Sequence, residues 1–392
     1  MNGALLADAR APLPTLGVLG GGQLGRMFVH AAQAAGYAVA VLDPDADGPA
    51  AQAAQQHVAA AYDDEAAWAE LAARCQAVTT EFENVPAQAL AWLGARLTVA
   101  PPAPAVAVCQ DRAREKAFFA RVGVPCAPHA VIASAADLDT ASAALFPAIL
   151  KTAALGYDGK GQVQVDTPAA LADAWSALGH TACVLERRLA LHAECSVIVA
   201  RGRDGDCVHL PVQQNLHRDG ILAVTQVPAP DVPAPLAAQA IDAGRTLAAA
   251  LDYVGVLCVE FFVLADGSLV ANEMAPRPHN SGHYSIDACD VSQFELQLRT
   301  LVGLPLVAPR LHSPAVMLNL LGDLWFDSEV STARTPRWDR VLALPGVHLH
   351  LYGKSSARRG RKMGHLTATA ATAADARTVA LEAAARLGLP AF

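Results

Sequence analysis

Lysine is scarce in this chain: five of the 392 residues are lysine, and arginine supplies the remaining positive charge. The 37 acidic residues outnumber the 29 Lys and Arg residues, so the formal net charge is −8. A chain with this balance has little positive charge for following a phosphate backbone, and we expect no nucleic-acid partner. Because the chain uses arginine in place of lysine almost throughout, each lysine that is present is a candidate for a required role. The five candidates are Lys116, Lys151, Lys160, Lys354 and Lys362.

Long apolar runs and cysteine pairs are also missing. No uncharged, proline-free apolar stretch approaches the roughly 18–20 residues of a membrane helix. Asp8 interrupts the short apolar stretch near the N-terminus and no basic segment precedes it, so we expect neither a membrane span nor a signal peptide. The eight cysteines are dispersed without a Cys-x-x-Cys pair. This pattern predicts reduced thiols in a cytoplasmic protein instead of a disulfide framework or a zinc site.

The first 110 residues alternate short apolar strands with helical patterns. Between the expected strands, helices are predicted to begin near residues 23, 65 and 86, and the strands are expected at 15–19, 37–42, 58–60, 77–80 and 97–100. Such alternation predicts an α/β unit with a doubly wound parallel sheet. A proline-rich segment at 101–104 closes this unit, so we place a domain boundary near residue 110.

The remaining chain has a different pattern. Residues 111–304 begin with a helical segment and continue with short strands joined by glycine-bearing turns, which predicts an α+β domain with antiparallel sheets. Residues 305–392 are expected to form a third, small β-rich unit that ends in an alanine-rich helix. Its strands are predicted near 316–320, 341–343, 347–352 and 365–369.

A glycine-rich segment, Gly20–Gly25, matches G-x-G-x-x-G between the first strand and the first helix, and Asp43 ends the second strand. This is the spacing of a dinucleotide-binding fingerprint. The physical argument is narrower: glycines let backbone N–H groups approach an anion at a helix N-terminus. A dinucleotide, a simpler phosphorylated ligand and a purely structural turn all stay open at this point.

A second glycine-rich segment, GYDGKGQ at 156–162, follows the strand that ends at Lys151. Its backbone donors and Lys160 are suited to covering phosphate oxygens, as a lid does. It is not a Walker loop, because it joins two strands and lacks the G-K-[ST]-helix ending. An ordinary glycine hairpin is the alternative for the loop taken alone.

Two glutamates lie within apolar strand sequences, Glu260 in CVEFF and Glu273 beside Asn272. Burying a carboxylate is costly unless it is paired or binds a metal. Two carboxylates and an amide on adjacent strands form an oxygen cluster suited to Mg²⁺ with nucleotide phosphates. The alternative is that each glutamate forms a salt bridge with an arginine.

Two polar loops lie further along the chain, one directly after the Glu273 strand and one in the C-terminal segment. Arg277, His279 and Asn280 belong to the first, RPHNSGH at 277–283, and its proline and glycine argue against the helix that an i,i+4 zinc pair of histidines would need. An anion- and substrate-binding loop is expected instead. The second, at 352–362, holds Lys354 and a basic turn at 358–362, for which a solvated surface turn is the alternative.

Together these segments resemble the ATP-grasp superfamily and, within it, the N5-carboxyaminoimidazole ribonucleotide synthetase family. The resemblance covers nearly the whole chain. It rests on GGGQLGRM at 20–27, EFENVP at 81–86, the segment 156–162, NLHRDGI at 215–221, NEMAPR at 272–277, HNSGH at 279–283 and GRKMGH at 360–365. One departure is the sequence TAA at 152–154, where the family often carries arginines.

The resemblance implies an ATP-grasp fold with an N-terminal domain at 1–110, a central ATP-grasp domain at 111–304 and a C-terminal domain at 305–392. It also implies site residues. Those expected at ATP are Arg112, Lys151, Gly156, Tyr157, Asp158, Gly159, Lys160, Gly161, Gln162, Glu186, Arg187, Arg188, Leu189, Glu194, His217, Asn272 and Glu273. Those expected at the ribonucleotide are Gly22, Gln23, Leu24, Glu81, Asp158, Ser281, His283, Lys354 and Arg361. The expected catalytic residues are Lys160, Arg277, His279 and Asn280, and the expected metal ligands are Glu260 and Glu273.

The implied reaction is a ligation in purine biosynthesis. ATP would phosphorylate bicarbonate to carboxyphosphate, and the amine of aminoimidazole ribonucleotide would take up the carboxyl group, with ATP and Mg²⁺ as cofactors. A homodimer and a hand-over to the mutase of the next step are further expectations from the resemblance. The alternatives are another ATP-grasp ligase such as a formate-dependent glycinamide ribonucleotide transformylase, an NAD-dependent dehydrogenase, and a non-catalytic nucleotide-binding regulator.

Overall fold

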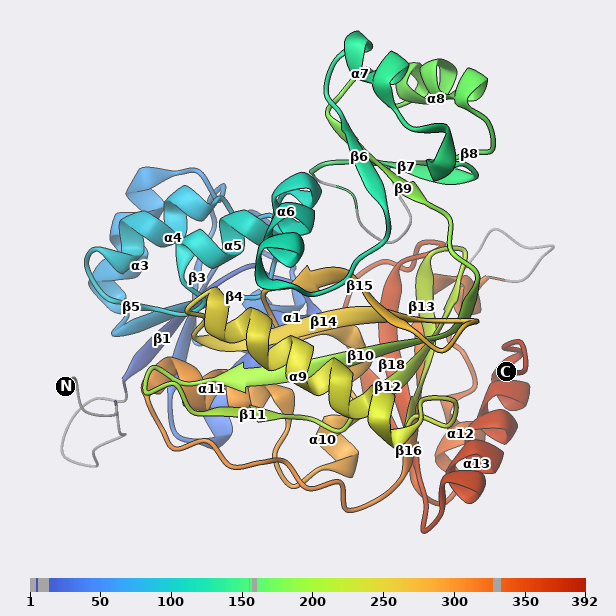
Figure 1. The fold of residues 1–392 in the computed structure, drawn as a ribbon. Helices are drawn as coiled ribbons and strands as arrows, with labels where there is room; N and C mark the ends of the chain where they lie inside the picture. The colour runs from blue at the N-terminus through green and yellow to red at the C-terminus, as the bar shows by residue number, and fades with distance from the viewer. Residues whose placement is uncertain (1–4, 6–13, 155, 157–160, 327–332) are drawn as a thin grey trace.

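The computed structural model of the 392-residue chain describes residues 5, 14–154, 156, 161–326 and 333–392 (Figure 1). Among these residues, no helix has both the length and the apolar character needed to cross a membrane. Three sheets organise the chain: a parallel sheet of five strands, a small antiparallel sheet of four, and a large antiparallel sheet of nine.

The N-terminal sheet is parallel, with the strand order β3-β2-β1-β4-β5. Helices pack on both of its faces: α1 and α11 share one apolar core with it, and α3 and α4 share another. The doubly wound parallel sheet predicted from the alternating pattern is therefore confirmed. Its elements are β1 Thr15–Leu19, α1 Gln23–Ala34, β2 Ala38–Leu42, α2 Pro49–Ala53, β3 Gln56–Val58, α3 Glu65–Arg74, β4 Ala77–Thr80, α4 Ala87–Gly94, β5 Thr98–Val99 and α5 Ala103–Cys109.

The small antiparallel sheet has the order β6-β9-β7-β8 and its own apolar core around Trp175. Figure 1 shows this sheet, with α7 and α8, projecting from the rest of the molecule above α6. The elements of this lobe, together with α6 which precedes it, are α6 Arg112–Val122, β6 His129–Ile132, α7 Ala135–Thr140, β7 Ala148–Thr152, β8 Gln162–Val165, α8 Leu171–Ala177 and β9 Cys183–Arg187.

The large sheet follows the order β15-β14-β10-β12-β13-β16-β18-β17, and β11 pairs with β10. Helix α9 packs on one face of β10 and β14, and α10 and α11 contribute to the core on the other face. Its elements are β10 Leu191–Arg201, β11 Cys207–His209, β12 Gln213–Arg218, β13 Ile221–Val227, α9 Ala234–Ala250, β14 Gly255–Leu264, β15 Leu269–Ala275, α10 Ser285–Ala288, α11 Gln293–Val302, β16 Ala315–Leu321, α12 Trp338–Leu342, β17 Val347–Leu351, β18 Lys362–Thr369 and α13 Ala373–Leu387.

The C-terminal strands do not form a sheet of their own. Strand β16 pairs antiparallel with β13, from Val224↔Leu318 to Val227↔Ala315, so β16, β18 and β17 extend the large sheet. Helix α13 packs against β16 and β18 and closes a separate core. The C-terminal segment is therefore β-rich, as predicted, and shares backbone hydrogen bonds with the central domain.

One local prediction fails. The strand expected at 341–343 is wrong, because residues Trp338–Leu342 form helix α12 with Val341 buried and Leu342 exposed. A short apolar run does not distinguish a strand from a helix turn. The proline-rich segment at 101–104 leads into helix α5, which has Pro104 in its first turn, where proline is tolerated.

We predict that Leu318→Ala lowers the free energy of unfolding by about 2–5 kcal/mol, because it removes a buried side chain from the core under α13. Urea denaturation measures the change. The matched control, Leu342→Ala, removes a leucine that is 53% exposed and should change stability by less than about 0.5 kcal/mol. Equal losses in the two variants would contradict the packing described here.

Candidate active site

A cavity of about 680 Å³ lies where the parallel sheet, the start of α6 and the large sheet meet. Its described lining residues include seven cationic and four anionic side chains, so the cavity suits an anionic ligand. It brings together segments far apart in sequence: Gly22, Gln23, Leu24, Glu81, Arg112, Ala153, Ala154, Gly156, Glu273, Arg277, His279, Asn280, Lys354, Arg361 and Lys362 are among its lining residues.

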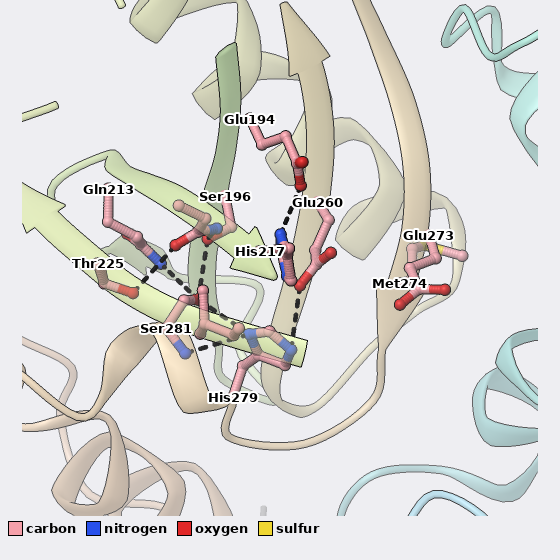
Figure 2. Close-up of polar contacts among 12 residues, drawn as sticks. Glu194, Ser196, Gln213, His217, Thr225, Glu260, Glu273, Met274, His279 and Ser281 are labelled. Carbon is pink, nitrogen blue, oxygen red and sulfur yellow. Dashed lines mark hydrogen bonds and ion pairs between the residues drawn. The ribbon is translucent and has the colours of Figure 1, made fainter. Parts of the chain in front are cut away.

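Glu260 and Glu273 are directly paired on the neighbouring strands β14 and β15, as the sequence predicts for adjacent strands (Figure 2). Glu273 lines the cavity and accepts a hydrogen bond from the Arg112 guanidinium at 2.8 Å. Glu260 lies 3.1 Å from Nε2 of His279. Burial and the Glu273 charge raise the pKa of Glu260, whereas Arg112 and Lys151 hold the pKa of Glu273 below its ordinary value against the effect of burial.

The alternative expected for these glutamates, a salt bridge to an arginine, is met for Glu273 through Arg112. The pairing does not satisfy every polar atom nearby, because Oδ1 of Asn272 is buried without a hydrogen-bond partner. A buried acceptor without a partner carries a desolvation penalty that a bound cation would remove. Two carboxylates with this amide therefore fit a hard, oxygen-preferring cation.

A buried cluster of two lysines and one glutamate lies next to these strands. Oε2 of Glu186, at the end of β9, lies 3.1 Å from Nζ of Lys151 and 3.5 Å from Nζ of Lys116. Burial alone would raise the pKa of Glu186, but the two lysines hold it below its ordinary value. Lys116 also donates to the carbonyl oxygen of Asn272 at 2.9 Å, so it links β9 to β15.

The sequence reasoning assigned Lys116 no place in the site. Two features of the sequence point to Lys116 as a site residue: lysine is rare in this chain, and Lys116 lies one helical turn after Arg112 on α6. That spacing puts both cations on one face of the helix. Neighbouring Glu115 was also missed: it is buried, accepts from the backbone N–H of Met274 at 2.6 Å, and burial raises its pKa to about 8.

The first glycine loop is already occupied by carboxylates. The N–H of Gly21 donates to Asp43 at 2.5 Å, and the N–H groups of Gly22 and Gly25 donate to Glu81 at 2.9 and 3.2 Å. A pyrophosphate would need these donors, and Asp43 is buried instead of exposed to a ribose. The dinucleotide alternative therefore fails on geometry, while the helix start at Gln23 and Leu24 still lines the cavity.

The loop at 277–283 crosses beneath the large sheet. Nδ1 of His279 is 2.9 Å from the Ser281 hydroxyl, which in turn lies 2.9 Å from the Ser196 hydroxyl (Figure 2). Residues Asn280–Gly282 form a single 3₁₀ turn, so the predicted absence of a helical histidine pair is confirmed. Ser281 and His283 are fully buried and do not line the cavity, and their contact with the ribonucleotide stays a prediction.

Other predicted nucleotide residues lie on the strands behind the cavity. Glu194 on β10 contacts Nδ1 of His217 on β12 at 2.6 Å, and this carboxylate raises the pKa of His217 although burial alone would lower it. Arg187 and Arg188 are exposed where β9 ends, and Leu189 follows them. None of these residues lines the cavity as described.

The second glycine loop is described only at its ends. Tyr157, Asp158, Gly159 and Lys160, including the predicted catalytic lysine, lie outside the described residues. Gly161 has φ +71°, and a Cβ there would lie 2.6 Å from Oγ1 of Thr152, so glycine is required. Gln162 begins β8 opposite Lys151, which confirms that the loop joins two strands.

The basic segment after β17 reaches the cavity. Lys354 donates from Nζ to the carbonyl oxygen of Lys362 at 2.6 Å, and both residues line the cavity with Arg361. The Arg361 guanidinium donates to the carbonyl oxygen of Ser356 at 2.9 Å. Arg358, Arg359 and Gly360 are exposed, as the solvated-turn alternative for 358–362 expects, although these residues also line the cavity.

Comparisons with known proteins agree with this architecture. Family models match at residues 13–110 (ribonucleotide synthetase preATP-grasp domain), 117–294 (ATP-grasp domain) and 315–378 (phosphoribosylaminoimidazole carboxylase C-terminal domain). The N5-carboxyaminoimidazole ribonucleotide synthase of Brucella melitensis is 45% identical over 365 residues, which cover 91% of this chain and 96% of that protein. The chain belongs to the N5-carboxyaminoimidazole ribonucleotide synthase family.

Relatives and solved structures support the same membership. The Bacillus subtilis synthase of this family is 40% identical, with 91% of both chains covered. An ADP complex of N5-carboxyaminoimidazole ribonucleotide synthetase superposes with a TM-score of 0.88 at 38% identity over 98% of both chains. The Aspergillus clavatus synthase in complex with ADP and 5-aminoimidazole ribonucleotide has a TM-score of 0.86 at 32% identity, covering 96% of this chain and 99% of that one. The family identification and the ATP-grasp fold predicted from the sequence motifs are confirmed.

We predict that Lys116→Met lowers the free energy of unfolding by about 1–3 kcal/mol, because Glu186 keeps Lys151 as a partner but the carbonyl oxygen of Asn272 loses its donor. Urea denaturation measures this loss. Arg114→Met is the matched control on the same helix: its side chain is 69% exposed, and the change should stay within about 0.5 kcal/mol. A Lys116→Met protein as stable as the control would show that the cluster is not a strong structural restraint.

Proposed function

We propose that this protein catalyses the ATP- and bicarbonate-dependent carboxylation of 5-aminoimidazole ribonucleotide to N5-carboxyaminoimidazole ribonucleotide, a carbon–nitrogen ligation in purine biosynthesis. The observation that carries the proposal is one cavity lined by the start of α1, the metal-suited strand β15, the loop after it and the basic segment 354–362. The complex of the Aspergillus clavatus relative with ADP and 5-aminoimidazole ribonucleotide supports this choice of ligands.

ATP with Mg²⁺ is the proposed phosphoryl donor. Glu260 and Glu273 would hold the metal ion, which would neutralise charge on the transferred phosphoryl group. Arg112, which lines the cavity, and Lys151, which is paired with Glu186 on the neighbouring strand, are proposed to contact phosphate oxygens. The predicted lid lysine and the segment from Glu186 to Leu189 keep their expected roles at the nucleotide.

The ribonucleotide is proposed to lie between the start of α1 and the segment 354–362. The N–H groups at a helix N-terminus favour a phosphate, and Lys354 and Arg361, which line the same cavity, supply full positive charge. Glu81 also lines this cavity with its carboxylate on the glycine loop, and burial raises its pKa. Arg277, held by Glu83, lines the same cavity and is proposed to act on the bicarbonate-derived group.

The reaction follows from this placement. A bicarbonate oxygen attacks the γ-phosphorus of ATP, the bond to the β-phosphate oxygen breaks, and ADP and carboxyphosphate form. The amine of the ribonucleotide then bonds to the carboxyl carbon, phosphate leaves, and the amine loses a proton. Phosphoryl transfer depends mainly on positioning and charge neutralisation, which the arginines and lysines here provide. Carboxyphosphate hydrolyses readily, so exclusion of water by a closed lid is part of the proposal.

A homodimer in the cytoplasm that passes its product to a mutase completes the proposal. The eight cysteines are free thiols, which agrees with a reducing compartment. Sedimentation velocity measures the oligomeric state directly.

The decisive experiment measures ADP release with bicarbonate, with and without 5-aminoimidazole ribonucleotide, and then with formate in place of bicarbonate. We expect release that requires both bicarbonate and the ribonucleotide. Release that requires formate would favour the transformylase alternative, and nucleotide binding without turnover would favour a regulator.

We predict that Glu273→Gln abolishes turnover at saturating Mg²⁺ while the protein stays folded, because the amide cannot replace a carboxylate that faces both Arg112 and the proposed metal. The ADP-release assay and circular dichroism measure these effects. Glu382→Gln, at a side chain that is 51% exposed on α13, is the control and should retain full activity. Wild-type kcat in Glu273→Gln would remove this residue from the metal site.

We predict that Lys354→Ala raises KM for the ribonucleotide by about tenfold or more, equivalent to about 1.4 kcal/mol of binding, with little change in KM for ATP. The reason is that Lys354 lines the same cavity as the start of α1. Steady-state kinetics with each substrate varied in turn measure both constants. Arg337→Ala, an exposed cation paired with Asp339, is the control, and a rise confined to KM for ATP would overturn the placement.

A further inference from the structure

A cluster of histidines lies behind the cavity, on the strands that end the large sheet. His348 and His350 are two residues apart on β17, so they lie on the same face of that strand. His350 is directly paired with His365 on the neighbouring strand β18. The carboxylate of Asp287, on the short helix α10, lies 2.9 Å from Nε2 of His350 and 3.8 Å from Nδ1 of His348.

His365 has a ring nitrogen without a partner. The residue is fully buried, its Nδ1 lies 3.0 Å from the Tyr352 hydroxyl, and its Nε2 has no hydrogen-bond partner. A buried polar atom in this state costs free energy unless something else satisfies it. When Nδ1–H donates to the Tyr352 hydroxyl, Nε2 carries the lone pair that a metal-ligating histidine uses, and a bound ion would satisfy this otherwise unpartnered atom.

We propose that Asp287, His350 and His365 bind a divalent transition-metal ion of the zinc class, with His348 as a fourth ligand. The ligand atoms of the first three residues lie within 4.8 Å of one another, the one such cluster of three that the described residues contain. Two or three imidazoles with one carboxylate are a donor set for Zn²⁺ or Co²⁺, whereas Mg²⁺ prefers oxygen ligands and water.

Binding requires a rotation of the imidazole rings. The rings of His350 and His365 are stacked, with centroids 4.5 Å apart and planes 13° from parallel, so their lone pairs do not yet converge on one point. Rotation about the Cβ–Cγ bond is soft. The His350 side chain is 29% exposed and His348 is 44% exposed, which leaves room for the movement and a route for the ion.

An ion at this position would connect two walls of the cavity. Asp287 lies on α10, shortly after the 277–283 loop, and the two paired strands β17 and β18 flank the segment that carries Lys354 and Arg361. The ion would therefore fix the basic segment relative to that loop. This metal site is distinct from the proposed ATP and Mg²⁺ sites, and metal binding here can be tested without any assumption about the reaction.

The test uses the full-length, untagged protein with Co²⁺, in excess Mg²⁺ so that carboxylate oxygen sites are filled. We expect one Co²⁺ per chain, with the visible absorption bands of a four-coordinate site that contains imidazole. Zn²⁺ should displace Co²⁺ and raise the melting temperature of the wild type. His350→Gln and Asp287→Asn should each weaken Co²⁺ binding by about tenfold or more.

The control is His312→Asn, an exposed histidine beside Ser313, which should bind Co²⁺ as the wild type does. His365 is left unchanged because its burial would endanger folding, and circular dichroism checks that the variants are folded. If a variant fails to fold, the X-ray absorption spectrum of the zinc-loaded wild type decides, and imidazole scattering is expected there. No stoichiometric Co²⁺ binding, no imidazole scattering, or unchanged affinity in folded His350→Gln would overturn the proposal.

Discussion

The central constraint on this structure is that charged groups at its cavity are buried and must neutralise one another. Arg112 faces Glu273, and Lys151 and Lys116 share Glu186. An isolated buried charge is costly, so each partner fixes the position of the other. These contacts connect α6, the small antiparallel sheet and strand β15, and so the cavity keeps its shape through electrostatics as much as through apolar packing.

The same constraint explains why a metal–nucleotide complex is a suitable ligand for this cavity. A free phosphate would gain Arg112 but leave Glu273 without a partner, and a free cation would gain Glu273 but leave Arg112 unpaired. A ligand that brings both a cation and an anion gives Glu273 and Arg112, both only partly exposed, a new partner each. We infer that the two components bind together, as an exchange of ion pairs on preformed strands.

Sequence reasoning was most successful where the information is local or set by strand pairing. Glu260 and Glu273 stand in two strands separated by a short turn, and antiparallel pairing places them opposite each other, as expected. It failed where distant segments decide the outcome. Nothing in the sequence of β16 indicates that it pairs with β13 across nearly ninety residues, since its apolar pattern suits any sheet. The role of Lys116 is equally nonlocal, because its partners lie on β9 and β15.

The first glycine loop shows why a motif specifies a backbone shape before it specifies a ligand. Gly20 has φ +116°, and a Cβ there would lie 2.6 Å from the Glu81 side chain, so glycine is needed for the close approach of that carboxylate. The loop therefore uses its glycines to accept an internal anion from β4 and not a pyrophosphate. Because Glu81 occupies the N–H groups of Gly22 and Gly25, the phosphate proposed for this cavity would meet the helix start at Gln23 and Leu24, between them. The same glycine motif is therefore compatible with a helix start whose glycine N–H groups bind an internal carboxylate and not a dinucleotide.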